Sequence, residues 1–236
     1  MPILNDTEKM QVGNVYREKS PTQAKRFGFS LIAERLPAMI EQYQTMIPVG
    51  KKAVLFCWRG GMRSQFTGQL LDMMGFDVYR IIGGYKAYRR YVNAYLEGTL
   101  PHKAVVLHGL TGVGKTEILH HLIQEGIPVL NLEELAKHRG SVFGKIGMPP
   151  SPSQKEFETG IVNALKKAES KGIFVVECES KRLGRLLVPQ CVMDTMKTGY
   201  TILLYASLQN RVERSLREMC IRDSNRRAFN VVLCFY

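Results

Sequence analysis

The chain has 236 residues, 45% of them hydrophobic and 23% charged. This length suits one large or two small globular domains, and the composition argues against a disordered, collagen-like or coiled-coil protein. The longest uninterrupted apolar runs have six residues, whereas a membrane-spanning helix needs roughly 20. The first residues also lack the basic and apolar segments of a signal peptide, so we expect a cytoplasmic protein without a membrane partner.

The balance of charge is strongly basic. Lysine and arginine total 33 against 21 acidic residues, which gives a net charge of +12, and the excess is spread over both halves of the chain. Such a distribution favours a polyanionic partner, nucleic acid above all, although a merely solvated basic surface is the alternative. The five cysteines are widely spaced and form no CxxC pair, so we expect neither a disulfide framework nor a structural metal.

The first hundred residues alternate between helical and strand patterns. Ser20 followed by Pro21 is typical of a helix start, and apolar residues at helical spacing continue to Tyr43. The next elements that we expect are a strand over 53–57, a helix that has Phe66, Leu70, Leu71 and Met74 on its inner face and ends at Gly75, a strand over 78–82 and a helix over 85–96. Strands that alternate with helices indicate an α/β fold with a parallel sheet.

A second α/β series follows a candidate linker at 97–101. Its expected elements are strands over 104–108, 128–132, 173–178 and 200–205, helices over 115–124, 154–170 and 208–218, and a long functional loop over 138–153. Residues 219–236 show no consistent period. Because a parallel sheet with so few strands in the first half would have open edges, we expect material to be missing at both ends.

The segment Gly109-Leu-Thr-Gly-Val-Gly-Lys-Thr116 is a complete GxxxxGK[ST] motif between a predicted strand and a predicted helix. Its glycines allow a tight turn whose backbone N–H groups bind phosphate oxygens, and the helix dipole favours negative charge. Lys115 is placed to reach the terminal phosphates, and the Thr116 hydroxyl is a candidate Mg²⁺ ligand. The motif predicts a phosphate site without identifying the rest of the ligand.

Cys57 stands at the end of a predicted strand, followed by a glycine-rich turn into a helix. N–H groups of such a turn and the positive end of the helix favour the thiolate, and Arg59 and Arg63 add charge for an oxyanion. Two chemistries fit. CxxxxxR[ST] is the skeleton of cysteine phosphatases, in which the arginine binds phosphate; equally, Cys57 could carry sulfur or selenium as a persulfide or selenylsulfide.

Together these motifs resemble the bacterial tRNA 2-selenouridine synthases, a family that joins a rhodanese-like domain to a P-loop domain. Five ordered blocks carry the resemblance: FCWRGGMRS at 56–64, GGYKAYR at 83–89, GLTGVGKT at 109–116, NLEELAKHRGSVFG at 131–144 and VECESKRLG at 176–184. The similarity runs from about Pro2 to Arg217. Family members normally open with an extra strand and a segment of the type Asp-Val-Arg-Ser-Pro, which are not found here.

The resemblance implies a transferase that acts on tRNA. The family alkylates 2-thiouridine at the wobble position with a geranyl group from geranyl diphosphate, and selenophosphate then replaces the geranylated sulfur with selenium, which leaves 2-selenouridine. Cys57 matches the family's catalytic cysteine. We assign the diphosphate of the geranyl donor to the P-loop, through Gly109, Thr111, Gly112, Gly114, Lys115 and Thr116.

Five further positions are candidates near this second site. Glu177 and Glu179 follow a strand, where the second acidic element of a P-loop fold is expected, and one of them is a candidate to help bind Mg²⁺. For His138, Arg139 and Ser141 two interpretations are open: a lid over the donor or the tRNA, or simple loop structure.

The resulting domain prediction has three parts. A rhodanese-like domain without its N-terminal strand occupies 1–98, a P-loop domain that is incomplete at its C-terminus occupies 102–217, and an atypical tail occupies 218–236. The expected partners are tRNA and a source of selenophosphate. Two other functions remain open on the residues alone: a P-loop NTPase or kinase with a regulatory rhodanese module, and a simple sulfurtransferase.

Overall fold

The computed structural model describes residues 3–140, 144–145 and 147–223. The chain divides into two compact units, Met1–Arg90 and Tyr91–Tyr236. The division lies inside helix α5 (Gly84–Glu97), ahead of the linker that we expected at 97–101. Within the described part of the chain, no helix is both long and apolar enough to cross a membrane.

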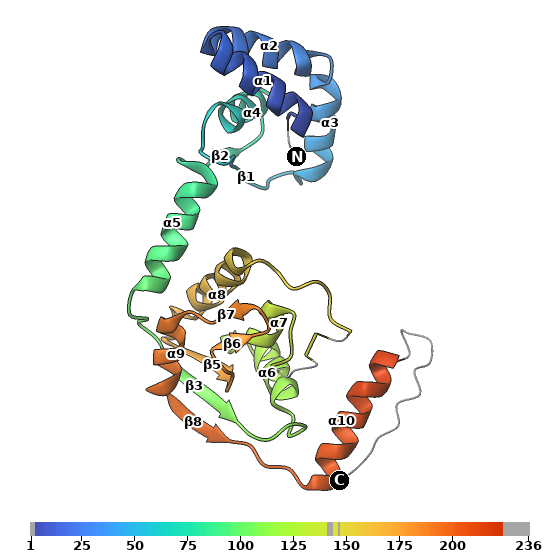
Figure 1. Cartoon of the computed structure of the whole chain (residues 1–236), viewed down its shortest axis with the longest axis vertical. Coiled ribbons are helices and arrows are strands. Elements are labelled where there is room, and N and C mark those ends of the chain that lie inside the picture. Colours follow the sequence, from blue (N-terminus) through green and yellow to red (C-terminus); the bar gives the residue numbers. More distant parts are fainter. Residues whose placement is uncertain (1–2, 141–143, 146, 224–236) are drawn as a thin grey trace. The chain divides into compact units, whose positions relative to one another are not determined.

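The first unit packs helices against a pair of short parallel strands (Figure 1). Ahead of α5 it contains α1 (Asp6–Glu18), α2 (Pro21–Ala33), α3 (Leu36–Met46), β1 (Ala53–Leu55), α4 (Met62–Met73) and β2 (Val78–Arg80). In the register of the two strands, Ala53 lies opposite Val78. Met39 and Tyr43 of α3 and Leu71 of α4 are buried together and form the core of this unit.

The helical pattern that we expected to run from Ser20 to Tyr43 is interrupted, since α2 ends at Ala33 and α3 begins at Leu36. Pro37 gives the physical reason. Proline has no N–H to donate, and its ring clashes with the carbonyl four residues earlier, so a helix seldom continues through it. In the first turn of a new helix, however, proline is well tolerated, and that is where Pro37 lies.

Helix α1 was not predicted, although its start carries a clear signal. The Asn5 side chain accepts a hydrogen bond from the Glu8 backbone N–H at 2.8 Å, and the Glu8 carboxylate accepts one from the Asn5 N–H at 2.9 Å. This reciprocal pair is a capping box. The helix packs against α2, yet none of its own residues is buried.

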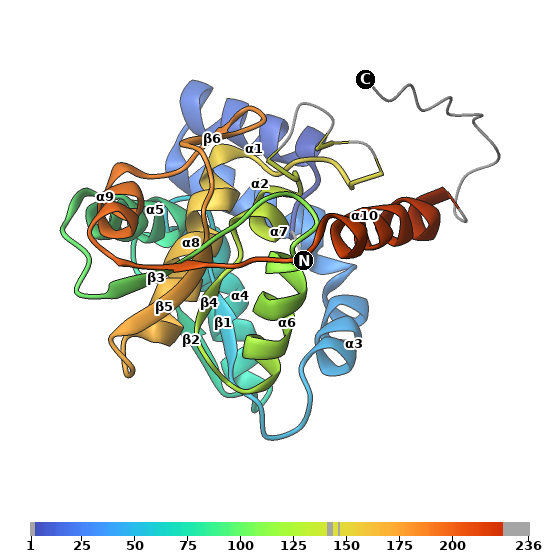
Figure 2. The ribbon, with the colours of Figure 1, turned by 90° about the horizontal axis from the view of Figure 1, so that it is seen from below.

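The second unit is built on a parallel sheet of order β4-β5-β3-β8, formed by β3 (Lys103–His108), β4 (Val129–Leu130), β5 (Ile173–Glu177) and β8 (Tyr200–Leu203). The helices of this unit beyond α5 are α6 (Lys115–Gln124), α7 (Leu132–Ala136), α8 (Gln154–Ala168), α9 (Gln190–Lys197) and α10 (Leu208–Asp223). The α/β class with parallel sheets is thereby confirmed. The segment after β8 leads directly into α10 (Figure 2).

Side chains of the sheet alternate between two apolar layers, as the pleat of a strand requires. Val106 and Phe174 belong to the larger buried cluster, which includes residues of α8 and α9. Leu107 and Val175 instead pack with Leu119 of α6. Helices therefore cover both faces of the sheet, and the loop after β3 opens at its carboxyl edge, where such folds bind ligands.

The sequence missed several short elements, namely α7, α9 and an antiparallel hairpin of β6 (Arg182–Leu183) and β7 (Leu186–Leu187). Segments of two to eight residues are too short to establish a period. At the other extreme, α10 continues to Asp223, beyond the end that we expected at 218. The atypical tail predicted over 218–236 therefore begins within this helix, and residues 224–236 lie outside the described part.

Candidate functional site

Cys57 lies between the end of β1 and the start of α4, in the turn that the sequence predicted. Ser64, in the first turn of α4, is buried, and its hydroxyl oxygen lies 3.3 Å from the Cys57 sulfur. The backbone of Arg59, Gly61 and Ser64 also lowers the pKa of this thiol, and the Gly61 carbonyl oxygen lies 3.9 Å from the sulfur. The turn therefore surrounds the sulfur with donors that stabilise a negative charge.

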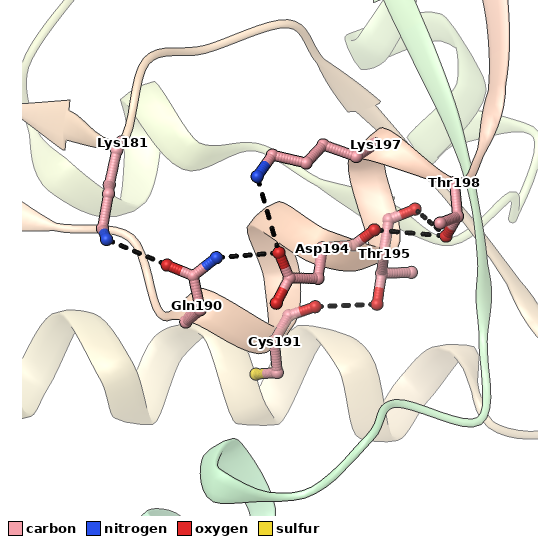
Figure 3. A network of polar contacts seen from close by, with 7 residues as sticks. All are labelled: Lys181, Gln190, Cys191, Asp194, Thr195, Lys197 and Thr198. Carbon is pink, nitrogen blue, oxygen red and sulfur yellow. Dashed lines mark hydrogen bonds and ion pairs between the residues drawn. The ribbon is translucent and has the colours of Figure 1, made fainter.

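The Cys57 thiol is activated by these donors. Burial by itself raises its pKa, but hydrogen bonds from the Ser64 hydroxyl and from the backbone outweigh burial and lower the pKa from 9.0 to about 7. A large fraction of Cys57 is thus thiolate, the nucleophilic form, at neutral pH. By contrast, burial raises the pKa of Cys178 and Cys191. The Cys191 sulfur takes no part in the polar network along α9 (Figure 3).

The start of α5, at Gly83 and Gly84, packs against the backbone of the Cys57 turn. Gly84 has φ of 60°, and a Cβ at this position would overlap the Cys57 carbonyl oxygen. Next to it, the Tyr85 N–H donates to the Cys57 carbonyl at 2.9 Å, and the Lys86 N–H donates to the Trp58 carbonyl at 3.1 Å. These are otherwise unpaired donors of the first turn of α5. They fix the Cys57 and Trp58 carbonyls of the turn in place.

Both predicted arginines lie at this turn. Arg59 and Arg63 are exposed, and together with Cys57 they line a hollow of about 440 Å³. Arg63 also lines a neighbouring hollow of about 360 Å³ with Cys57 and Ser64. The structure thus brings together the three residues that the sequence assigned to this site, and an anion bound at the sulfur would meet two guanidinium groups.

The GxxxxGK[ST] segment forms a loop between β3 and α6, as predicted. Gly112 and Gly114 have φ of 79° and 95°, a backbone region that favours glycine. The Lys115 ammonium donates to the Gly109 carbonyl at 2.9 Å. A hollow of about 640 Å³ borders the loop, and five of the six predicted loop residues line it: Thr111, Gly112, Gly114, Lys115 and Thr116.

Three carboxylates share the same hollow. Glu177 at the end of β5, Glu179 after it and Glu133 of α7 each place an oxygen within 4.8 Å of the others. Burial, followed by the charges of Glu133 and Glu179, raises the pKa of Glu177 to about 8, although Lys115 opposes this. Glu177 is 1% exposed, and its Oε1 has no hydrogen-bond partner among the described residues. Such a cluster favours protonation or a bound cation.

Two features of this site were missed by the sequence. Glu133 looked like an ordinary acidic residue, because the short helix α7 was not predicted. The second is α10, whose Arg211 donates to the Thr111 carbonyl at 2.9 Å and whose Arg214 donates to the Gly112 carbonyl at 2.8 Å. Arg214 also pairs with Glu117 at 2.9 Å. Two arginines three residues apart on a predicted helix were the signal available.

The candidate lid residues separate in the structure. Arg139 lines the hollow of the P-loop together with Glu177 and Glu179. His138 is 8% exposed and packs against Gly184 in the β6–β7 turn, where a Cβ would lie 2.7 Å from the imidazole ring. Ser141 lies outside the described residues. Arg139 thus lies at the P-loop hollow, whereas His138 is packed against the β6–β7 turn, as a structural loop residue would be.

A family model described as the tRNA 2-selenouridine synthase AAA domain matches residues 102–230. The chain belongs to the tRNA 2-selenouridine synthase family. The match includes the P-loop, the three carboxylates and α10. It also extends past Arg217, where we expected the similarity to end.

Relatives in the tRNA 2-selenouridine synthase family match nearly the whole chain. The protein of that name from Hydrogenovibrio crunogenus is 36% identical over 228 residues, which cover 92% of this chain and 62% of the relative. The Nitrosomonas europaea protein is 34% identical, with 90% and 56% covered, and the Pseudomonas savastanoi pv. phaseolicola protein is 38% identical, with 94% and 60% covered. The chain therefore spans less than two thirds of the length of these synthases.

Proposed function

We propose that the chain converts wobble 2-thiouridine of tRNA to 2-selenouridine through a geranylated intermediate, using geranyl diphosphate and selenophosphate. The observation that carries the proposal is that one chain holds two anion-binding turns of different chemistry. One presents the Cys57 thiol with a pKa of about 7, and the other is a P-loop beside three carboxylates. A reaction with a diphosphate leaving group followed by chalcogen transfer needs two such sites.

The first unit is proposed to be a rhodanese-like domain that acts in the selenium step. Arg59 and Arg63 are placed to bind the anionic selenophosphate beside the Cys57 thiolate. Attack of the thiolate on phosphorus breaks the P–Se bond, leaves the electron pair on selenium as hydroselenide, and forms a phosphocysteine that water hydrolyses to phosphate. A selenylsulfide on Cys57 would need selenium at a higher oxidation state than selenophosphate supplies.

The second unit is proposed to bind the diphosphate of the geranyl donor. The N–H groups of the P-loop face the phosphate oxygens, and Lys115 offsets the charge that builds on the leaving oxygen as the carbon–oxygen bond breaks. Arg139 lines the same hollow and adds a further positive group. With the sulfur of 2-thiouridine as the nucleophile, the products are the S-geranyl thioether and diphosphate.

The carboxylates fit a magnesium ion at this second site. The buried Glu177 carries an oxygen with no hydrogen-bond partner among the described residues, and Glu133 and Glu179 crowd it with like charge. Oxygen ligands of this kind suit Mg²⁺. Glu177, Glu179 and the Thr116 hydroxyl would hold the ion, and Mg²⁺ neutralises phosphate charge when it is bound.

A nucleoside assay separates the two sites. The chain is incubated with tRNA that carries 2-thiouridine, geranyl diphosphate and selenophosphate, and the nucleosides are identified by mass. Lys115→Ala is expected to leave 2-thiouridine unchanged, because the diphosphate loses its ammonium. Cys57→Ser is expected to accumulate geranylthiouridine, because a hydroxyl is a far poorer nucleophile at neutral pH.

Matched controls are Lys197→Ala, an exposed lysine of α9, and Cys191→Ser, a cysteine with a raised pKa. Both should form 2-selenouridine normally. Formation of 2-selenouridine at the wild-type rate by Cys57→Ser would remove the assigned role of the thiolate. Nucleotide turnover without any change in tRNA would favour a P-loop NTPase or kinase, and thiocyanate formation from thiosulfate and cyanide alone would favour a simple sulfurtransferase.

A further inference from the structure

A groove in the first unit is left open between α1, α2 and the start of α4. Its volume is about 460 Å³, within the range of roughly 300–1,000 Å³ that small-molecule sites occupy. Apolar side chains from all three helices and from the segment before α1 line it: Leu4, Val12, Ala24, Phe29, Ile32 and Phe66.

Two glycines keep this groove open. A Cβ at Gly13 would meet nothing within 4 Å, and a Cβ at Gly28 would meet only the Val12 side chain, at 3.6 Å. Both lie inside helices, where glycine costs about 0.5–1 kcal/mol relative to alanine. A helix pair that simply packed together would gain stability from larger residues at these positions. Close packing of the two helices therefore does not require glycine at either position, and the absence of side chains here leaves the groove open.

The groove borders the hollows at Cys57. Met62 and Arg63 line both the groove and the hollow that contains Cys57 and Arg59. The Arg63 carbonyl accepts a hydrogen bond from the Thr67 hydroxyl, whereas the Arg63 guanidinium has no hydrogen-bond or ion-pair partner among the described residues. An occupant of the groove therefore has its apolar part among the helices and its polar end beside a free guanidinium group and the Cys57 sulfur.

We propose that this groove binds the geranyl chain of the geranylated tRNA intermediate while its sulfur is replaced, an inference that rests on the proposed function. Hydroselenide released at Cys57 forms the C2–Se bond of the uridine. The C2–S bond breaks, its electron pair leaves with the sulfur, and the geranylthiolate takes a proton from water and departs as geranylthiol. An apolar groove beside Cys57 holds the chain out of water and directs C2 toward the selenium.

Direct binding tests the groove independently of turnover. Trp58 is the chain's only tryptophan and lines both hollows at Cys57, so its fluorescence reports a bound nucleoside. The full chain is titrated with the nucleoside S-geranyl-2-thiouridine and, as reference, with 2-thiouridine. We expect the geranylated nucleoside to bind at least tenfold more tightly.

Gly28→Leu fills the groove without removing any contact, and leucine is a better helix former than glycine. It should weaken binding of the geranylated nucleoside at least tenfold and lower the rate at which tRNA that is already geranylated is converted to 2-selenouridine. Gln23→Leu is the matched control, because it adds the same side chain to an exposed position of α2 outside the groove. It should bind like the wild type.

Equal binding by the wild type and by folded Gly28→Leu, or no preference for the geranylated nucleoside, would overturn the inference. A wild-type dimer that Gly28→Leu converts to monomers, with nucleoside binding unchanged, would assign the groove to a second copy of the chain instead. If the wild type binds the geranylated nucleoside as expected yet modifies no tRNA, the groove stands and the proposed function fails.

Discussion

The Ser64 hydroxyl is one of the groups that lower the pKa of Cys57. Removing it in Ser64→Ala leaves burial, which raises the pKa of the thiol, opposed only by the backbone donors. Alkylation of Cys57 by iodoacetamide should therefore have its midpoint near pH 7 in the wild type and closer to the ordinary value of 9.0 in the variant. Mass analysis of the peptide that contains Cys57 separates its reaction from that of Cys178.

Ser30→Ala is the control for this measurement, because Ser30 is an exposed serine whose hydroxyl bonds to its own helix. Its alkylation midpoint should equal that of the wild type. An unchanged midpoint in Ser64→Ala would show that the turn, and not the hydroxyl, sets the acidity of the thiol.

Glu177 should make stability depend on pH in metal-free protein. Its pKa is about 8 in the folded state against an ordinary 4.5, so the folded state binds the extra proton. The stability that this proton contributes is fully present below pH 4.5 and is lost as the pH rises to 8. Glu177→Gln stays neutral and should be more stable than the wild type at pH 8, by on the order of a few kcal/mol, with little difference near pH 5.

Urea denaturation in the presence of a chelator at the two pH values measures this difference. The exposed Glu125→Gln, on the segment after α6, serves as control and should change neither value. A stability difference that is the same at both pH values would mean that Glu177 is ionised in the folded state.

At the scale of the elements, the start of α5 leaves little room for a side chain. In Gly84→Ala, the new Cβ overlaps the Cys57 carbonyl oxygen and the Gly60 nitrogen, at a φ of 60° that costs other residues about 1–2 kcal/mol by itself. We expect a lower midpoint of urea unfolding together with a higher pKa of Cys57, because the turn must move. Gly13→Ala, with nothing within 4 Å, should instead stabilise by about 0.5–1 kcal/mol.

The elements that the sequence predicted correctly are those whose signals lie in neighbouring residues. The P-loop and the bounds of α6 follow from adjacent glycines, a lysine and a helical period, and the observed helix is the predicted one, Lys115–Gln124. The Cys57 turn is local for the same reason. The support of that turn by Tyr85 and Lys86 joins segments that no spacing rule connects.

The contacts of α10 also join segments that are distant in the sequence, and they could not be predicted from it. Arg211 and Thr111 are 100 residues apart in sequence, and their hydrogen bond depends on β8 lying beside β3. Strand order in a parallel sheet is decided by packing of the whole unit, so a single sequence does not specify which later helix will reach the P-loop. Glu133 was missed for a related reason, since its role depends on the position of β5 relative to α7.

Charge is a property of the whole molecule. The net charge of +12 comes from basic residues in both units, and α5 alone carries Lys86, Arg89 and Arg90 among its tyrosines. Arg90 is exposed. Basic and aromatic side chains on one helix suit the phosphates and bases of RNA. The relatives are named tRNA 2-selenouridine synthases, and the proposed function gives the basic excess of the chain a polyanionic substrate.

tRNA affinity should consequently fall steeply as salt is added, because each phosphate contact releases condensed counterions. Fluorescence anisotropy with labelled tRNA between 50 and 200 mM KCl should show a decrease of at least about tenfold, with a linear dependence of log K on log salt. Arg90→Ala should lower affinity at every salt concentration and reduce the slope by about one, the effect of one lost phosphate contact. An affinity that stays flat across this range would contradict nucleic-acid binding. If Arg90→Ala left the dependence of log K on log salt unchanged, Arg90 would not contact a tRNA phosphate. The prediction for the other basic residues of the two units would stand.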